Sequence, residues 1–170
     1  MGFKRSRSAQ RPSHESLEGA IEALEALLDA RLPVGYRDFL REYGRNTSIR
    51  GSIGEISIDG FYSPLTSARR LDLHRRIEAQ RDELPDGVIP IALCSFGDEL
   101  CLTVRGDNHG KVYLWSHEES LPRRDPRKRY PGLDLGFDYQ FKPDDWPEHP
   151  SLTLIVERFE IFWQKFSASQ

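Results

Sequence analysis

The sequence predicts a protein that combines helices with an antiparallel sheet. Residues 88–118 contain three short strand candidates joined by two turn sequences, a pattern that is typical of an antiparallel meander. Amphipathic helical patterns precede and follow this segment. With 170 residues, the chain fits one domain and is long enough for a substantial core.

Alternation within the meander assigns its residues to two faces of the sheet. In the middle strand candidate, residues 100–104, the leucines and the valine fall on one face, and Cys101 and Thr103 fall on the other. The next candidate, residues 111–115, alternates in the same way. Glycine, aspartate and asparagine supply the turns between the candidates. We therefore expect this segment at the centre of the sheet.

The first predicted helix covers residues 13–31 and carries an apolar stripe and an acidic stripe. Both stripes recur at helical spacing, so they lie on different faces. In the simpler interpretation, the acidic stripe is a face exposed to solvent. In the alternative, it is a surface that binds a basic partner. The apolar residues are Leu17, Ile21, Leu24 and Leu28, and the acidic residues are Glu15, Glu18, Glu22, Glu25 and Asp29.

The second predicted helix begins at Pro33, a favoured first-turn residue, and ends at Gly44. Its buried stripe is expected to contain Tyr36, Phe39, Leu40 and Tyr43. Two short helices in sequence could form a helix-turn-helix reader of DNA. The outer positions of the second helix mix arginines with acidic residues, however, and this mixture argues against DNA reading.

Three further elements are expected outside the meander. Residues 49–62 are strand-like and are interrupted by glycines that favour bulges or tight turns. Ser63 is the expected N-cap of a third helix, residues 64–81. Ser151 is the expected cap of a C-terminal helix, whose apolar face would pack on the sheet. That face contains Leu152, Ile155, Val156, Phe159, Phe162, Trp163 and Phe166.

Composition limits the setting and the partners. The formal net charge of −3 does not suit a generic nucleic-acid binder. Two cysteines are too few for a disulfide framework, and we expect buried thiols in a reduced, cytoplasmic setting. No apolar run is long enough for a transmembrane helix, so no membrane partner is expected. We divide the chain into a disordered basic arm, residues 1–12, and a single domain, residues 13–170, with a long loop at 121–150.

The sequence offers no arrangement that favours catalysis. No pattern such as CxxC, HxxxH or a glycine-rich phosphate loop is present, so we expect no enzyme activity, cofactor or metal. The basic run at residues 123–129 is the best argument for nucleic acid, but Tyr130 is its only nearby stacking residue. A solvated or protein-binding loop is the simpler interpretation of that run.

Several motifs resemble the SUKH superfamily, which includes fungal cell-wall synthesis regulators and many bacterial immunity proteins. The central meander carries IPIA, GDELCL and GKVYLWSHE in the order typical of that family. LPVGYRDFL, at residues 32–40, is similar to the family's entry motif LPxxYxxFL. VERFEIF, at residues 156–162, resembles its closing helix.

The resemblance implies an α+β domain with a curved, mainly antiparallel sheet, N-terminal helices and a C-terminal helix packed against it. It also implies an immunity protein that neutralises a cognate toxin, such as a nuclease, by stoichiometric binding. A regulatory scaffold of the fungal type is the alternative, and a nucleic-acid-associated protein is a third. Trp115 or Tyr62 could supply an aromatic anchor, although core packing is the simpler interpretation of Trp115. The candidate partner-binding surface contains Glu22, Glu25, Asp29, Tyr62, Asp98, Glu99, Asp107, Trp115 and Glu118.

Overall fold

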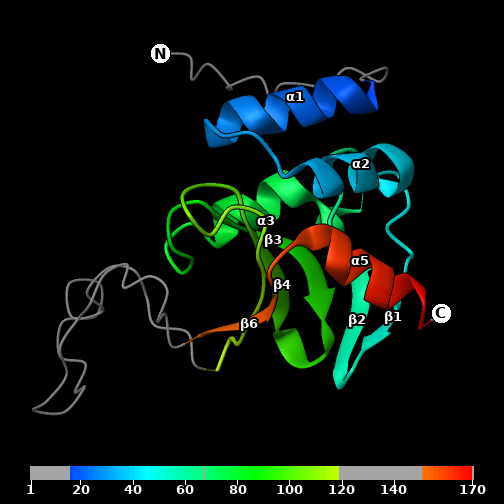
Figure 1. Ribbon diagram of the computed structural model, residues 1–170. Coiled ribbons are helices and arrows are strands. Elements are labelled where there is room, and N and C mark those ends of the chain that lie inside the picture. The colour runs from blue at the N-terminus through cyan, green and yellow to red at the C-terminus, as the bar shows by residue number, and fades with distance from the viewer. Residues whose placement is uncertain (1–15, 67, 119–150, 170) are drawn as a thin grey trace, which may run out of the picture.

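The computed structural model describes residues 16–66, 68–118 and 151–169 (Figure 1). The predicted basic arm, residues 1–12, and the predicted long loop with its basic run, residues 121–150, lie outside the described residues.

The described strands form one six-stranded antiparallel sheet, in which each strand pairs with the next one in the sequence. The predicted meander is confirmed as β3, β4 and β5, and it lies within the sheet with β2 on one side and β6 on the other. The strands are β1 (Gly51–Ile53), β2 (Ile56–Phe61), β3 (Val88–Cys94), β4 (Glu99–Thr103), β5 (Val112–Trp115) and β6 (Leu152–Val156).

Helices pack on this curved sheet, which confirms the predicted α+β class (Figure 1). The first helix packs on the second, the second contacts the C-terminal helix, and the C-terminal helix contacts both edge strands, β1 and β6. The third helix packs against β3. These helices are α1 (Leu17–Leu28), α2 (Val34–Tyr43), α3 (Leu73–Ala79) and α5 (Phe159–Ser167).

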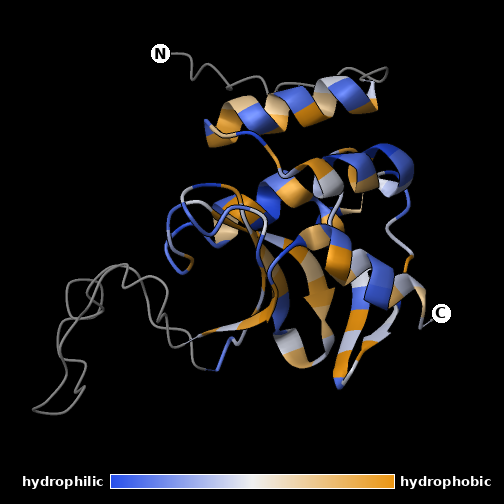
Figure 2. Cartoon of the chain, in the orientation of Figure 1, coloured by the Kyte–Doolittle hydropathy of each residue, from blue (hydrophilic) through white to orange (hydrophobic). Residues whose placement is uncertain are grey.

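The alternation predicted for β4 and β5 is confirmed by the two apolar clusters. Leu100 and Leu102 belong to the larger cluster, which α1, α2 and α5 also line. Cys101, Tyr113 and Trp115 alternate with them and form the smaller cluster on the other face. Figure 2 shows apolar residues along the strands and an alternation of apolar and polar residues along α1.

Aromatic side chains join α2, β2 and α5 within the larger cluster. The Phe39 ring lies 5.0 Å from that of Phe61 on β2 and 4.7 Å from that of Trp163 on α5, measured between centroids. Tilted and edge-on contacts of this kind add to the gain from burial. The fully buried members of this group are Tyr36, Phe61, Phe159, Phe162 and Phe166.

A bulge in β2 at Gly60 confirms the expectation that the glycines of residues 49–62 favour bulges. The register with β3 shifts between Ile58 and Gly60. A Cβ atom at Gly60 would lie 2.9 Å from the carbonyl oxygen of Thr47, so a larger residue would push this segment outward.

The predicted start of the third helix is wrong. Ser63 instead exchanges backbone hydrogen bonds with Leu71 and Leu73, and its hydroxyl contacts the carbonyl oxygen of Gly44. The helix begins at Leu73, where the side chain of Asp72 caps the N–H of Arg75 at 3.2 Å. A short 3-10 turn, Arg69–Leu71, precedes it.

The predicted C-terminal helix begins later than expected, because its first part is the edge strand β6. Leu152 pairs with Trp115, and Val156 pairs with Val112. The helix follows only at Phe159, and its apolar face packs into the larger cluster as expected.

Candidate interaction surfaces

The structure divides the nine predicted partner-binding residues between the interior and the surface. Glu25, Tyr62, Glu99 and Trp115 are buried, with exposed fractions of 6%, 2%, 0% and 3%. They therefore contribute no exposed area to a surface in this conformation. The other five are exposed or half-exposed: Glu22, Asp29, Asp98, Asp107 and Glu118.

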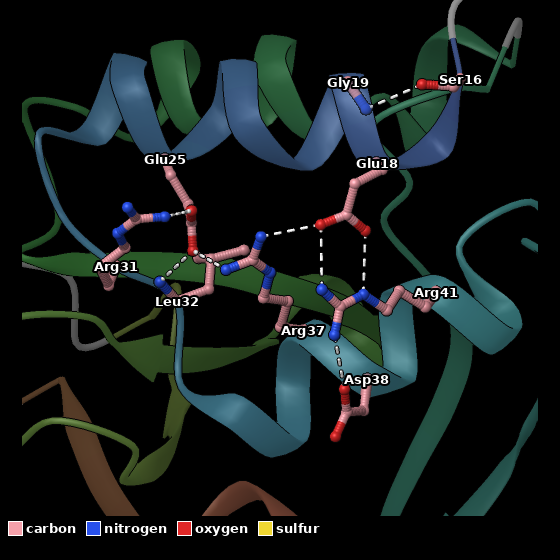
Figure 3. Close-up of polar contacts among 9 residues, drawn as sticks. All are labelled: Ser16, Glu18, Gly19, Glu25, Arg31, Leu32, Arg37, Asp38 and Arg41. Carbon is pink, nitrogen blue, oxygen red and sulfur yellow. Dashed lines mark hydrogen bonds and ion pairs between the residues drawn. The ribbon is translucent and has the colours of Figure 1, made fainter.

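Glu25 on α1 holds the connection to α2. Its carboxylate accepts a hydrogen bond from the backbone N–H of Leu32 at 3.0 Å and from Arg31 at 2.8 Å (Figure 3). Arg37 approaches the same carboxylate at 3.6 Å. A carboxylate with this many donors is satisfied within the fold and has little left to offer a partner.

Glu18, another member of the acidic stripe, also reaches α2. It accepts hydrogen bonds from Arg41 at 2.9 Å and from Arg37 at 2.8 Å (Figure 3). The hydrogen bonds from Arg41 and Arg37 lower the pKa of Glu18 from 4.5 to about 2. The acidic stripe is therefore shared: Glu18 and Glu25 hold α2, whereas Glu22 and Asp29 face solvent.

Glu99 is the centre of a buried polar cluster. Its carboxylate accepts hydrogen bonds from the Tyr62 hydroxyl, from Arg76 Nε at 2.5 Å and from Gln80 Nε2 at 2.7 Å. Burial, followed by the Glu99 charge, raises the pKa of Tyr62. The cluster ties β4 to α3 and to the end of β2, and this is a structural role.

Trp115 and the two thiols are also interior groups. Trp115 and Cys101 belong to the smaller apolar cluster, and Cys94 belongs to the larger one, which confirms the expected burial of both thiols. Burial raises the pKa of Cys94 to about 12 and that of Cys101 well above its usual value. Thiols of this kind are poor nucleophiles at neutral pH.

One exposed group lies at the end of the sheet where β3 turns into β4. Asp98 Oδ1 accepts a hydrogen bond from the backbone N–H of His117 at 3.2 Å and lies 2.9 Å from its Nδ1. Glu118 follows directly and is exposed. We call residues 95–98 the Phe96 turn, because Phe96 at its tip has an exposed fraction of 94%.

The turn at this position was predicted, but the exposure of Phe96 was not. The feature in the sequence that could have indicated this exposure is an aromatic residue between Ser95 and Gly97, two residues typical of a turn. A predicted turn could have been examined for exposed apolar residues, but the sequence alone does not show which way the ring points.

The second exposed group lies at the opposite end of β4. The turn after β4, which contains Asp107, is tied to the end of α1 by Arg105, which donates hydrogen bonds to the carbonyl oxygens of Leu28 and Asp29. His109 Nε2 lies 3.0 Å from the carbonyl oxygen of Arg31. We call residues 28–31 and 105–109 together the α1 end.

A pocket of about 290 Å³ opens beside the α1 end. Residues of α1, of α3, of the connection from α3 to β3 and of the turn after β4 line it, among them Leu27, Ile77, Arg81, Leu84 and Arg105.

The five exposed acidic residues do not form one surface. Asp98 and Glu118 lie at the Phe96 turn, and the others lie at or near the α1 end.

Comparison with known proteins decides the family. The model of the SMI1 / KNR4 family (SUKH-1) matches residues 17–131, more than half of the chain. The chain belongs to the SUKH-1 family. The match extends from α1 through β5, so it includes both exposed groups.

A curated relative of this SUKH-1 chain comes from a prophage. The chain is 28% identical over 126 residues to the SPbeta prophage-derived uncharacterized protein YokK of Bacillus subtilis (strain 168). The alignment covers 62% of this chain and 64% of the relative, so the chain spans about two thirds of that protein's length at most. No solved structure matches the chain significantly.

The described part of this SUKH-1 chain contains no group of three or more His, Cys, Asp or Glu side chains placed to hold a metal ion. Within the same residues, no helix is both long and apolar enough to cross a membrane. SUKH-1 proteins are generally binding or regulatory proteins rather than enzymes.

Proposed function

We propose that this protein is a cytoplasmic immunity protein that binds a cognate toxin and neutralises it by occupying its surface. The observation that carries the proposal is membership of the SUKH-1 family. The prophage origin of the relative YokK also supports it, since mobile elements are a natural setting for toxin and immunity genes.

The physical character of the fold suits a stoichiometric blocker. The aromatic core joins α2 and α5 to the sheet, Glu99 ties α3 to β4, and Glu18 and Glu25 hold α1 on α2. A rigid scaffold loses little conformational entropy when it binds, which favours high affinity. Exposed carboxylates at both ends of β4 would attract a basic partner and speed its association.

Co-expression tests this function. A toxin-type gene adjacent to the gene for this chain would be expressed in a susceptible host, alone and together with the chain. We expect growth arrest with the toxin alone, rescue by the chain, and a purified complex with a one-to-one ratio of the two proteins.

A pull-down with the chain as bait supplies the opposing outcome. Failure to rescue, together with recovery of a cell-wall enzyme or a kinase as the stoichiometric partner, would contradict the immunity proposal. It would support a regulatory scaffold of the type found among fungal members of the superfamily.

A further inference from the structure

We infer that the Phe96 turn is the anchor with which this protein binds its toxin. The inference rests on the proposed immunity function and deepens it. It assigns the contact to one end of the sheet and states the chemistry of the surface that this end fits: an apolar pocket on the toxin with a rim of lysine or arginine.

Phe96 is held in a conformation that does not favour a phenylalanine. Its φ is 65°, in the left-handed region that glycine and asparagine adopt most readily. Its exposed fraction is 94%, so the ring gains almost nothing from burial in the free protein. Backbone strain combined with an exposed aromatic ring is expected where a residue serves binding rather than folding.

The turn that carries Phe96 is fixed on both sides. The N–H of Cys94 donates to the carbonyl oxygen of Asp98 at 2.9 Å, which closes the turn. The Asp98 carboxylate contacts the backbone and the ring of His117, beyond β5. A Cβ atom at Gly97 would lie 3.5 Å from the His117 ring, so the turn packs on that ring. The backbone that carries the phenyl ring is therefore fixed in advance of binding, which reduces the entropy lost in a complex.

Other exposed apolar residues make weaker anchors. The large apolar residues that are exposed in the described part of the chain are Leu27, Val34, Phe96, Leu154 and Ile161. Phe96 is the aromatic residue among them and has the highest exposed fraction. Aromatic residues are enriched in interface cores, whereas leucine and valine are under-represented among the residues that dominate binding energy.

Charge around the turn indicates the partner's rim. Asp98 is half-exposed, Glu118 is exposed, and Asp59 contacts Ser95 at 3.4 Å. Asp59 also lines a pocket with Arg50 and Arg70. Asp98 and Glu118 therefore carry the negative charge beside the exposed ring. These two carboxylates fit an apolar pocket edged by basic side chains, which would also steer the encounter.

The decisive variant is Phe96→Asn. Asparagine tolerates the left-handed conformation, so the variant removes the ring without straining the turn, and its thermal unfolding temperature should equal or exceed that of the wild type. The probe is the purified product of the adjacent toxin gene, inactivated in its catalytic site, and the readout is Kd by titration calorimetry. We expect Phe96→Asn to raise Kd at least about 30-fold, the effect of a dominant interface residue.

The matched control is Val34→Asn, which changes another exposed apolar residue on α2 to the same side chain. We expect its Kd to stay within about threefold of the wild type. If Phe96→Asn also stays within about threefold while the wild-type chain neutralises the toxin, the anchor is wrong and the immunity function stands. If the wild-type chain neither binds nor neutralises the toxin, the proposed function fails, and the toxin is excluded as the occupant of this turn.

Two charge-reversal variants test which end of the sheet binds the toxin. Glu118→Lys, at the Phe96 turn, should slow association with the toxin by about tenfold at low salt, whereas Asp107→Lys, at the opposite end, should not. A larger effect at Asp107 would move the interface to the α1 end and overturn the inference. A wild-type dimer in sedimentation that Phe96→Asn converts to a monomer would assign the turn to a second copy of the chain instead.

Discussion

Glu99 is a buried carboxylate whose charge is compensated by three side-chain hydrogen-bond donors. Its carboxylate has an exposed fraction of 0% but accepts from a hydroxyl, a guanidinium and an amide. The free-energy cost of burying an unpaired carboxylate is far larger than the gain from any one of these hydrogen bonds. All three partners are therefore needed to stabilise the buried charge.

Replacement of Glu99 by alanine should destabilise the protein by about 3 kcal/mol, because it leaves Arg76, Tyr62 and Gln80 without their acceptor. Arg76 is about one third exposed, so water compensates part of its loss. Urea unfolding followed by tryptophan fluorescence measures the change. Glu118→Ala is the control, and this exposed change should stay within about 0.5 kcal/mol. Equal effects of the two substitutions would contradict the structural role of Glu99.

At the scale of elements, two carboxylates of α1 connect this helix to α2. Glu25 accepts a hydrogen bond from the N–H of Leu32 in the connection between α1 and α2, and Glu18 binds Arg37 and Arg41 on α2 itself. Arginines on α2 thus neutralise part of the acidic stripe that would otherwise repel itself along α1.

The contacts of Glu18 predict a dependence of stability on pH. Since folding lowers the pKa of Glu18 from 4.5 to about 2, its contribution is complete above pH 4.5 and is lost as pH falls toward 2. Thermal unfolding of the wild type and of Glu18→Gln should therefore differ at pH 7 and converge near pH 2. Because the site is exposed, high salt should also reduce the difference. A difference that does not change between pH 7 and pH 2 would show that Glu18 acts through packing instead.

For the whole molecule, the two thiols report on opposite faces of the sheet. Cys94 belongs to the larger apolar cluster and Cys101 to the smaller one. A reagent must therefore enter two separate apolar clusters to modify both thiols.

Labelling of the native protein by a thiol reagent such as DTNB at pH 8 should be slow for both cysteines. Burial raises the pKa of Cys94 to about 12 and that of Cys101 well above its usual value, so little thiolate forms even where the reagent can enter. Labelling should become complete in unfolding concentrations of urea, with both thiols reacting together. Rapid modification of one thiol in the native state would indicate local opening of the face on which it lies.

Much of the fold could be predicted from local patterns, because those patterns record which side chains avoid water. Alternation in β4 and β5 predicted two apolar faces, and the structure contains two clusters with those members. The stripes of α1 and α2 predicted the buried faces of these helices in the same way. The limits of β6 were missed because Leu152, Ile155 and Val156 fit a helical stripe as well as a strand. Pairing with β5, which is distant in the sequence, decides between the two.

Local patterns in the sequence were enough to predict the fold class, the meander, the family and the two stripes of α1. Which charged residues serve the interior and which remain for a partner depends on tertiary packing. Glu22 and Glu25 are alike in the sequence, yet the chain reversal after α1 brings donors to Glu25 and leaves Glu22 in solvent. Trp115 and Tyr62 were the predicted aromatic anchors, but packing buries both of them and leaves Phe96, which the sequence did not single out, exposed. Burial depends on contacts between distant segments, and spacing along the chain does not record those contacts.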